Sequence, residues 1–384
     1  MKICVATGTR AEYGLLKPLI NRLKACPQFN LQILVTGAHL SPEFGLTYRQ
    51  IEEEGLKVDY KVEMLLSSDT AEGITKSMGL GMLGFTEAFK NLEPDLLVIL
   101  GDRYEMLAMA STALIFKIPI AHIHGGEITE GAYDDAIRHA ITKMSHLHFS
   151  STESYKHRII QMGEQPDRVF NVGAIGLDNI VSLDLWSKEE LEKNLNIRFK
   201  PHNFLISFHP ETLAEISVER QFENLLDALT KLEDSFFIFT KANADTNGRI
   251  INQMMENFVS QNGDKSALFD SLGSLRYLSV MKIADAVVGN SSSGIIEAPS
   301  VGTATINIGD RQKGRIQADS VLNCGSDTKE IYDLLKKAQE PDFNVRFREV
   351  ENPYGTGNTS AQIVEVLKEI DLSNFGPKRF YNFI

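Results

Sequence analysis

The sequence predicts an α/β protein with two Rossmann-like lobes, each built on a parallel sheet covered by helices on both faces. Short, almost continuously apolar runs alternate with longer stretches of helical periodicity, which is typical of strands buried in a parallel sheet. This alternation stops near residues 171–185 and then starts again. The chain has 384 residues, which exceeds the ~250 residues at which single cores stop growing. We therefore expect two lobes with the active site in the cleft between them.

The first lobe is predicted from five pairs of a strand and a helix. Its apolar runs are "KICVA", "LQILVTG", "DLLVIL", "IPIAHI" and "LHFSS", and the helical patterns that follow them cover residues 12–25, 43–54, 103–117, 134–144 and 152–162. Another helical pattern covers residues 70–92. Functional residues are expected after the strands, because ligands of doubly wound sheets bind at the carboxyl ends of the strands.

The second lobe repeats this arrangement with "FLISFHP", "SFFIFT", "DAVVGN" and "ATINIG", each followed by a helical pattern. We place the first lobe at residues 1–175 and the second at 176–365. The C-terminal segment has a helical start at residue 359, and we expect the tail at 366–384 to pack back onto the first lobe.

Composition and charge exclude several classes of protein. With 43% hydrophobic and 23% charged residues, the sequence has the composition of an ordinary globular protein. A formal net charge of -12 disfavours nonspecific binding to nucleic acid. The three cysteines have no CxxC spacing, which argues against a disulfide framework or a zinc-thiolate site. The sequence has no signal-peptide pattern and no apolar run near ~20 residues, so we expect a cytoplasmic protein without a membrane segment.

The motif "GLGMLG" (79–84) matches the G-x-G-x-x-G pattern of dinucleotide-binding proteins. It lies inside the helical pattern at 70–92, and no strand directly precedes it. The turn and helix N-terminus that hold a pyrophosphate in such proteins are therefore missing. We predict no nicotinamide cofactor and expect no other cofactor.

Small and polar residues follow two predicted strands, where they could bind an anion. The stretch "TGTRAEYG" (7–14) brings Arg10 to the start of a helix, although an ordinary turn with a solvated arginine fits the motif equally well. The stretch "GNSSSGIIEAPSVG" (289–302) offers backbone N–H groups and the hydroxyls of Ser291 and Ser292, which suit a diphosphate. Helix capping alone is the simpler alternative. Glu297, in the helix that follows, could accept hydrogen bonds from ribose hydroxyls.

Two further loops carry basic residues after a strand. "FHPE" (208–211) contains His209, and "NIGDRQKGR" (307–315) contains Arg311 and Arg315. In a chain this acidic, basic loops at several strand ends indicate an anionic ligand rather than a role in solubility.

Acidic residues and histidines cluster after two strands of the first lobe. "LGDRYE" (100–105) places Asp102 and Arg103 after a very apolar strand, and "AHIHGGEITEGAYDDAIRHA" (121–140) contains His124, Glu127 and Asp134. A single aspartate at such a position is more often a helix cap than a catalyst. Their coincidence at two strand ends of one lobe favours acid/base catalysis.

A metal site is the alternative interpretation of the same histidines. His122 and His124 lie two apart on one predicted strand, hence on one face, and with Glu127 they could bind a divalent ion. No cysteine assists, and the anion already has several cationic partners. We therefore predict acid/base roles and no metal.

Seven blocks resemble, in order, those of the hydrolysing UDP-N-acetylglucosamine 2-epimerases of the bacterial sialic-acid type. They are "TGTRAEYG", "LGDRYE", "HIHGGE", "DDAIRHAITKMSHLH", "FHPE", "GNSSSGIIE" and "NIGDRQKGR". The resemblance covers nearly the whole chain. It implies a glycosyltransferase-B-like pair of lobes, a homodimer or higher homo-oligomer formed through first-lobe helices, and conversion of UDP-N-acetylglucosamine and water into UDP and N-acetylmannosamine.

The resemblance also implies roles for individual residues. The UDP and substrate ligands would be Arg10, His209, Asn243, Ser291, Ser292, Glu297 and Arg311, to which we add Arg103, beside Asp102. Asp102 and Asp134 match acidic catalytic positions, and His209 is included among the catalytic residues. His124 departs from the "HIEGGE" of many relatives, so His124, Glu127 and Asp134 all remain candidates for the second acid/base.

The chemistry calls for two acid/base groups. The C2 proton of the sugar is barely acidic, so cleavage of the C1–O bond first, with a stabilised leaving group, makes C2 deprotonation feasible. The resulting 2-acetamidoglucal must be protonated at C2 from the opposite face and hydrated at C1. Three alternatives stay open: the same reaction on a UDP-N,N'-diacetylbacillosamine-type sugar, a glycosyltransferase of the same fold, and a nucleotide-sugar sensor without catalysis.

Overall fold

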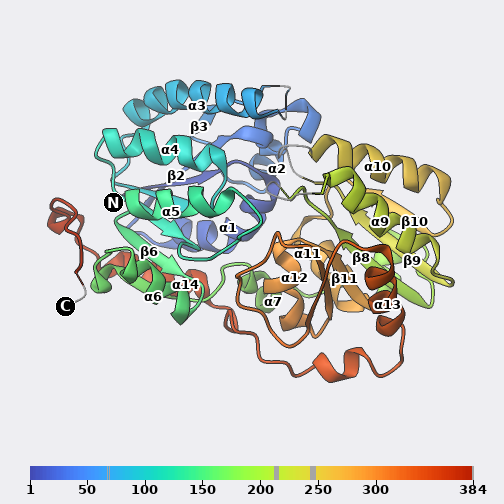
Figure 1. Cartoon of the computed structure of the whole chain (residues 1–384). Helices are drawn as coiled ribbons and strands as arrows, with labels where there is room; N and C mark the ends of the chain where they lie inside the picture. Colours follow the sequence, from blue (N-terminus) through green and yellow to red (C-terminus); the bar gives the residue numbers. More distant parts are fainter. Residues whose placement is uncertain (67, 69, 212–215, 243–247, 383–384) are drawn as a thin grey trace. The chain divides into compact units, whose positions relative to one another are not determined.

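The computed structural model describes residues 1–66, 68, 70–211, 216–242 and 248–382, which form two compact units (Figure 1). The first unit comprises Met1–Glu127, Asp134–Asp178 and Tyr354–Ile384, and the second comprises Ile128–Tyr133 and Asn179–Pro353. Each unit contains one parallel sheet with interleaved helices. The predicted α/β class with two Rossmann-like folds is confirmed.

The sheet of the first unit has seven strands in the order β3-β2-β1-β4-β5-β6-β7, and neighbouring strands pair in parallel. Chain order reverses between β1 and β4, and ligands of doubly wound sheets bind beyond the strand ends at such a switch point. The strands are β1 (Lys2–Thr7), β2 (Asn30–Thr36), β3 (Tyr60–Val62), β4 (Leu96–Leu100), β5 (Ile120–Ile123), β6 (Leu147–Ser150) and β7 (Val169–Asn171).

Both faces of this sheet are buried, as the side chains of β1 show by packing alternately into two hydrophobic clusters. Ile3 and Val5 join one hydrophobic cluster with α1 (Arg10–Ala25) and α14 (Thr359–Glu369), whereas Cys4 and Ala6 join another with α3 (Ala71–Leu92) and α4 (Tyr104–Ile115). The period of two along a strand sends neighbouring side chains to opposite faces. The remaining helices are α2 (Tyr48–Glu53), α5 (Asp134–Met144) and α6 (Glu153–Gln161), and the short helix α7 (Leu177–Ser182) crosses from the first unit into the second after Asp178.

The C-terminal helix α14 belongs to the first unit, where it packs beside α1. Its first N–H groups are capped by a residue far away in the sequence. The carboxylate of Asp178 accepts from the N–H of Thr359 at 2.7 Å and from that of Ser360 at 2.8 Å. A buried carboxylate at a helix N-terminus satisfies donors that have no partner within the helix. Asp178 thereby fixes the point at which the chain re-enters this unit.

The sheet of the second unit has six strands in the order β10-β9-β8-β11-β12-β13, with parallel pairings throughout. Its switch point lies between β8 and β11, in the place that β1 and β4 hold in the first unit. The strands are β8 (His202–Ser207), β9 (Ser235–Thr240), β10 (Ser266–Phe269), β11 (Ala286–Gly289), β12 (Thr305–Ile308) and β13 (Val321–Cys324).

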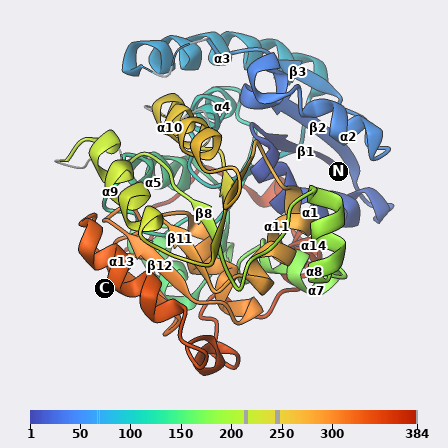
Figure 2. The ribbon, with the colours of Figure 1, turned by 90° about the vertical axis from the view of Figure 1, so that its right-hand side faces the viewer.

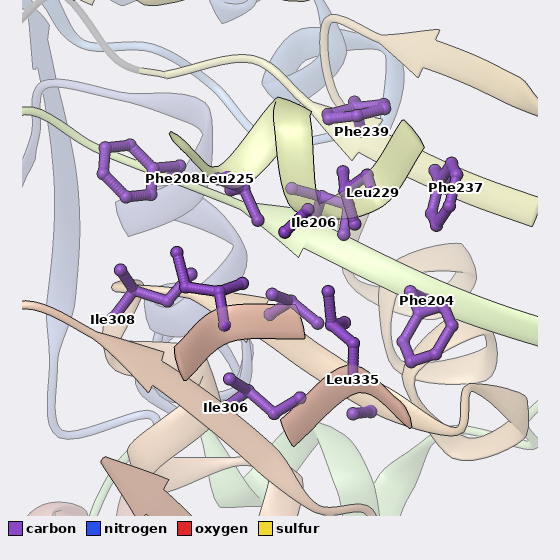
Figure 3. Packing of buried hydrophobic residues seen from close by; sticks show 14 of the residues in the cluster. Phe204, Ile206, Phe208, Leu225, Leu229, Phe237, Phe239, Ile306, Ile308 and Leu335 are labelled. Atoms are coloured by element: carbon purple, nitrogen blue, oxygen red, sulfur yellow. The ribbon is translucent and has the colours of Figure 1, made fainter. Parts of the chain in front are cut away.

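Helices cover both faces of this second sheet (Figure 2). One face packs against α9 (Val218–Thr230), α10 (Gly248–Gln261) and α13 (Thr328–Ala338), and the other against α8 (Lys188–Leu195) and α11 (Gly273–Ile283). Figure 3 shows the first of these cores, in which Leu225 and Leu229 of α9 and Leu335 of α13 pack with Ile206 and Ile306 of the sheet. The short helix α12 (Ser292–Ile296) follows β11.

Two sequence motifs have a local structural explanation. The "GLGMLG" motif lies within α3, as predicted, and a Cβ on Gly84 would come within 2.5 Å of Val62 Cγ1. Gly84 therefore allows α3 to pack closely against the edge strand β3. Only the second half of the helix predicted at 43–54 is α-helical, because Gly45 and Leu46 take left-handed φ values of 83° and 50°.

Two further features concern the cysteines and the hydrophobicity of the helices. Cys4, Cys26 and Cys324 are all free thiols. Across the ranges placed by the structure, none of the helices has the length and apolarity needed to span a bilayer.

Candidate functional site

Backbone N–H groups of the loop after β1 form hydrogen bonds with side chains of the same segment. Glu12 Oε2 accepts from the N–H of Gly8 at 2.7 Å and from that of Thr9 at 3.1 Å, while Thr9 Oγ1 accepts from the Glu12 N–H at 3.2 Å. Burial raises the pKa of Glu12 to about 7, although nearby Arg103 acts in the opposite direction. Since these N–H groups are engaged, anion binding by this loop would depend chiefly on the side chain of Arg10, at the first position of α1.

Asp102, just after β4, forms an ion pair with Arg138 of α5. The Arg138 side chain is only 1% exposed, and it also donates to the carbonyl of Glu127 at 3.0 Å and to Asp135 Oδ1 at 3.2 Å. A buried guanidinium is stable only when its donors are paired in this way. Arg138 therefore ties the ends of β4 and β5 to α5. The sequence analysis missed this residue, which lies 36 positions from Asp102.

Arg103 lies beside Asp102 but is directed to a different carboxylate. Its Nε and Nη2 atoms both lie 3.2 Å from the carboxylate oxygens of Glu105, which is fully buried. This bidentate pair compensates a charge that would otherwise be costly to bury. A role for Arg103 in substrate binding stays a prediction.

His122 of β5 supports the backbone next to Asp102. Its Nε2 lies 2.7 Å from the carbonyl oxygen of Gly101, which can only accept, so Nε2 carries a proton. Burial lowers the pKa of His122 to about 3, so the ring is neutral, and its Nδ1 lies 3.2 Å from the hydroxyl oxygen of Thr142, which donates its proton to the Arg138 carbonyl at 3.0 Å. Both ring nitrogens are therefore engaged within the protein.

The geometry also bears on a metal site at these histidines. The strand β5 ends at Ile123, and His124 takes a left-handed φ of 66°, so His122 and His124 do not continue one strand face as the sequence suggested. Within the part of the chain that the structure describes, no group of three His, Cys, Asp or Glu side chains is placed to hold a metal ion.

His124 and Glu127 form a buried pair after β5. The Ile175 N–H donates to His124 Nε2 at 3.1 Å, so this nitrogen is an acceptor and the proton of the neutral ring is on Nδ1. That Nδ1 lies 3.5 Å from Glu127 Oε1, which also accepts from the Ser151 hydroxyl at 2.7 Å. The pair thus has a defined polarity, with a proton on the imidazole facing the carboxylate.

Asp134 is the first residue of α5, half-buried and one turn before Arg138 on the same helix face. Its neighbour Asp135 contacts Arg138 and lies 3.4 Å from His139 Nε2. We call Asp102, His124, Glu127, Asp134 and Arg138 the acid/base cluster. All of them lie at the ends of the adjacent strands β4 and β5 or on α5.

In the second unit, Asn290 joins the loops after β8 and β11. Its Oδ1 accepts from the His209 N–H at 2.7 Å, and its Nδ2 donates to the His209 carbonyl at 2.9 Å. The Asn290 carbonyl accepts from Arg311 Nη1 at 3.1 Å and from Gln312 Nε2 at 2.8 Å. Gly289 makes this junction possible, because a Cβ there would lie 2.2 Å from the carbonyl oxygen of Ser207.

The serine turn follows this junction. Ser291 caps α12, Ser292 is the first residue of that helix, and Glu297 is buried at its end. Together with His209 and Arg311 these residues follow β8, β11 and β12, which are neighbours in the sheet. We call His209, Ser291, Ser292 and Arg311 the donor cluster. Asn243, also predicted as a ligand, lies outside the described residues.

Glu211 is another residue that the sequence analysis did not select. It is buried, and its Oε2 accepts from the Asp310 N–H at 3.2 Å. Burial raises the pKa of Glu211 above its ordinary value. This contact links the loop after β8 to the loop that carries Arg311.

A family model described as UDP-N-acetylglucosamine 2-epimerase matches residues 21–368. The chain belongs to this family. The resemblance predicted from seven sequence blocks is confirmed, and with it the prediction of an enzyme of the 2-epimerase type.

Several relatives and solved structures of this 2-epimerase family extend over nearly the whole chain. The GDP/UDP-N,N'-diacetylbacillosamine 2-epimerase (hydrolyzing) of Campylobacter jejuni is 47% identical over 342 residues, covering 89% of this chain and 88% of its own. The polysialic acid biosynthesis protein P7 of Escherichia coli is 39% identical over 383 residues, with 99% and 97% covered. The crystal structure of Neisseria meningitidis UDP-GlcNAc 2-epimerase bound to UDP-GlcNAc has a TM-score of 0.79 at 20% identity, covering 96% of this chain and 100% of its own, and confirms the fold.

Proposed function

We propose that this 2-epimerase is hydrolysing and acts on a UDP-linked 2-acetamido sugar, releasing UDP and the free C2 epimer. The observation that carries the proposal is the acid/base cluster, in which Arg138 holds Asp102 beside a second centre, the His124–Glu127 pair. Epimerisation through an alkene needs two proton-transfer groups, one for each face of the sugar. Helix caps alone would not require a buried arginine that links two strand ends.

The first step is elimination of UDP. The C1–O bond breaks, its electron pair leaves with the diphosphate, and a base takes the C2 proton, leaving a C1=C2 double bond. We assign the base to Asp102, whose carboxylate is fixed by its ion pair with Arg138. The donor cluster would stabilise charge on the leaving group, where loss of one donor typically costs ~10²–10³ in rate.

The second step is hydration of the glycal. A proton is delivered to C2 from the opposite face, and water adds its hydroxyl to C1, so the atoms balance as UDP-sugar plus water giving UDP plus epimer. We assign this delivery to the His124–Glu127 pair because its two groups lie 3.5 Å apart and either of them can carry a proton. Asp134, at the start of α5, is the alternative donor.

The similarity to the diacetylbacillosamine 2-epimerase supports UDP-N,N'-diacetylbacillosamine as the first substrate to test, and the similarity to the polysialic acid biosynthesis protein supports UDP-N-acetylglucosamine as the second. The 34% identical enzyme of Legionella pneumophila is also named a UDP-N,N'-diacetylbacillosamine 2-epimerase (hydrolyzing). Either product is a sugar of the kind used to make sialic-acid-like or legionaminic-acid-like polysaccharides.

The test is an NMR time course of the purified protein with each UDP-sugar in heavy water. We expect UDP to be released together with a C2-epimeric sugar that carries one deuterium at C2. Product without deuterium at C2 would contradict the elimination and hydration steps. Turnover that requires an added acceptor sugar would indicate a glycosyltransferase, and UDP-sugar binding without product would indicate a sensor.

We also propose that the chain forms a homodimer through the first-unit helices α3 and α4, which pack side by side (Figure 1). Both helices expose large apolar side chains, with Leu83 70% and Ile115 77% exposed. Light scattering should give the dimer mass for the wild type and the monomer mass for Leu83→Glu combined with Ile115→Glu. A monomeric wild type would refute this interface.

A further inference from the structure

A chain of hydroxyl groups runs beneath the serine turn of the second unit. Tyr277, on α11, is partly buried, and its phenol oxygen lies 2.6 Å from Ser293 Oγ. Ser293 Oγ donates to Ser291 Oγ at 3.0 Å, and the Ser293 N–H also points to Ser291 Oγ at 3.4 Å. Three hydroxyls therefore connect α11 to the residue that caps α12.

The proton directions in this chain follow from counting donors. Each hydroxyl has a single proton. Since Ser293 donates its proton to Ser291, its contact with Tyr277 must be donated by the phenol. Burial raises the pKa of Tyr277, with the nearby charge of Glu297 acting in the same direction, so the phenol keeps its proton at neutral pH.

Ser291 is the last of the three linked hydroxyl groups, and its own proton is available for donation. Its Oγ already accepts from the hydroxyl and the N–H of Ser293, so its own proton is left for another acceptor. Hydrogen bonds that follow one another in a single direction polarise each other and strengthen the terminal donor. An anionic oxygen, which offers only lone pairs, is the ligand that such a donor recognises.

We propose that Tyr277 is a positioning residue that acts through Ser293 to aim the hydroxyl proton of Ser291 at a phosphate oxygen of the bound nucleotide diphosphate. This inference rests on the proposed function, because it assumes that the serine turn binds the leaving group. Tyr277 itself would not touch the nucleotide. Without it, the Ser293 hydroxyl can rotate and the Ser291 hydroxyl loses its fixed direction.

The test compares UDP with uridine, which has no phosphate, by isothermal titration calorimetry on the full-length protein. For Tyr277→Phe we expect a ~10-fold weaker Kd for UDP, a smaller effect than removal of a direct donor, and an unchanged Kd for uridine. Tyr332→Phe on α13 is the matched control, because it makes the same substitution outside the hydroxyl chain. Equal losses for UDP and uridine would show a general distortion and overturn the proposal.

A double-mutant cycle tests the route through Ser291. In the Ser291→Ala background, Tyr277→Phe should have no further effect on UDP binding, because the donor that it aims is absent. Ser293→Ala should reproduce Tyr277→Phe, whereas Ser293→Thr, which keeps the hydroxyl, should restore UDP binding. If Tyr277→Phe does not fold, the two Ser293 variants decide the question, and additive effects in the cycle would refute the relay.

These outcomes separate the inference from the proposed function. A wild type that binds UDP but forms no epimer would refute the 2-epimerase proposal and leave the relay to be judged by its variants. A wild type that turns over while Tyr277→Phe and Ser293→Ala bind UDP normally would refute only the relay. A wild type that does not bind UDP would refute both.

Discussion

The two units have the same strand order around their switch points, but the groups placed there are chemically different. In the first unit the loops after β4 and β5 are held by charged pairs, Arg138 with Asp102 and Arg103 with Glu105. In the second unit the loops after β8 and β11 are held by a neutral amide and by hydroxyls, from Asn290, Tyr277 and the serines. Under the proposed function, one topology would thus serve two tasks, control of proton transfer in the first unit and presentation of hydrogen-bond donors in the second.

The largest effect is expected from breaking the charged pair of the first unit. Asp102→Asn should lower kcat by ~10²-fold or more, within the usual range for loss of a general base. UDP binding should be unchanged, because the proposed diphosphate donors lie mainly in the second unit. Steady-state kinetics and calorimetry measure the two quantities.

Asp135→Asn is the control for this variant, because Asp135 also contacts Arg138. We expect it to keep most of the activity. Equal losses in the two variants would mean that Arg138 is merely loosened and that Asp102 has no chemical role of its own.

Substitutions in the second acid/base centre should lower the rate of UDP release less than Asp102→Asn does. His124→Ala and Asp134→Asn should allow some glycal to escape with UDP, because elimination continues while C2 protonation is slowed. His124→Asn is the better variant, since asparagine tolerates the left-handed φ of 66° at this position. Product analysis by NMR detects the glycal, and its absence from all three variants would remove these residues from the hydration step.

Within the second unit, Asn290→Ala should weaken UDP binding by ~10-fold, about 1.4 kcal/mol. The substitution removes both hydrogen bonds that fix the backbone of His209. Deuterium incorporation at C2 should stay complete, and no glycal should accumulate, because proton transfer is assigned to the other unit. Asn262→Ala, at the end of α10, is the control. Glycal release from Asn290→Ala would break the division of tasks between the units.

The smallest expected effect is on stability, and it concerns Glu12 under the β1 loop. Burial raises the pKa of Glu12 from 4.5 to about 7, so the folded state binds a proton that the unfolded state has lost in this interval. The contribution of Glu12 to stability is therefore complete below pH 4.5 and decreases as the pH rises to about 7.

Glu12→Gln isolates this contribution, because the amide cannot titrate and its oxygen can still accept from Gly8 and Thr9. The unfolding free energy of the wild type relative to the variant should fall by ~3 kcal/mol across the interval. Denaturant titrations at several pH values measure this difference, in which His122 and the other titrating groups cancel. A difference that does not change with pH would show that Glu12 is ionised in the folded protein.

The sequence was most informative where a strand is long and fully buried. The central residues of β1, β4, β8 and β9 are apolar, because both faces of the sheet are covered. The edge strands β3, β7, β10 and β13 were not predicted, since each has three or four residues and pairs on one side only. So short a run has no periodicity that distinguishes it from a loop.

The candidate site shows the same limit. Residues directly after buried strands, such as Asp102, His124 and Ser291, could be selected from the sequence because strand ends are where doubly wound sheets bind ligands. The residues that hold these side chains in place could not be selected from the sequence. Arg138 reads as an ordinary helical arginine until its ion pair with Asp102 is known, and Asn290 reads as one of several small polar residues in the motif after β11. Their roles depend on which loops the sheet order brings together.

The short segment Ile128–Tyr133 belongs to the second unit, although the first unit contains the residues on both sides of it, Glu127 and Asp134. Within the second unit, the Glu130 N–H donates to the Lys313 carbonyl at 3.0 Å, and Gly131 lies against the backbone of Asp310. A recombinant fragment 179–353 would lack this segment. A chimera that exchanges the second unit with a relative would have to exchange 128–133 as well, so the two units cannot be treated as interchangeable modules divided by a single cut.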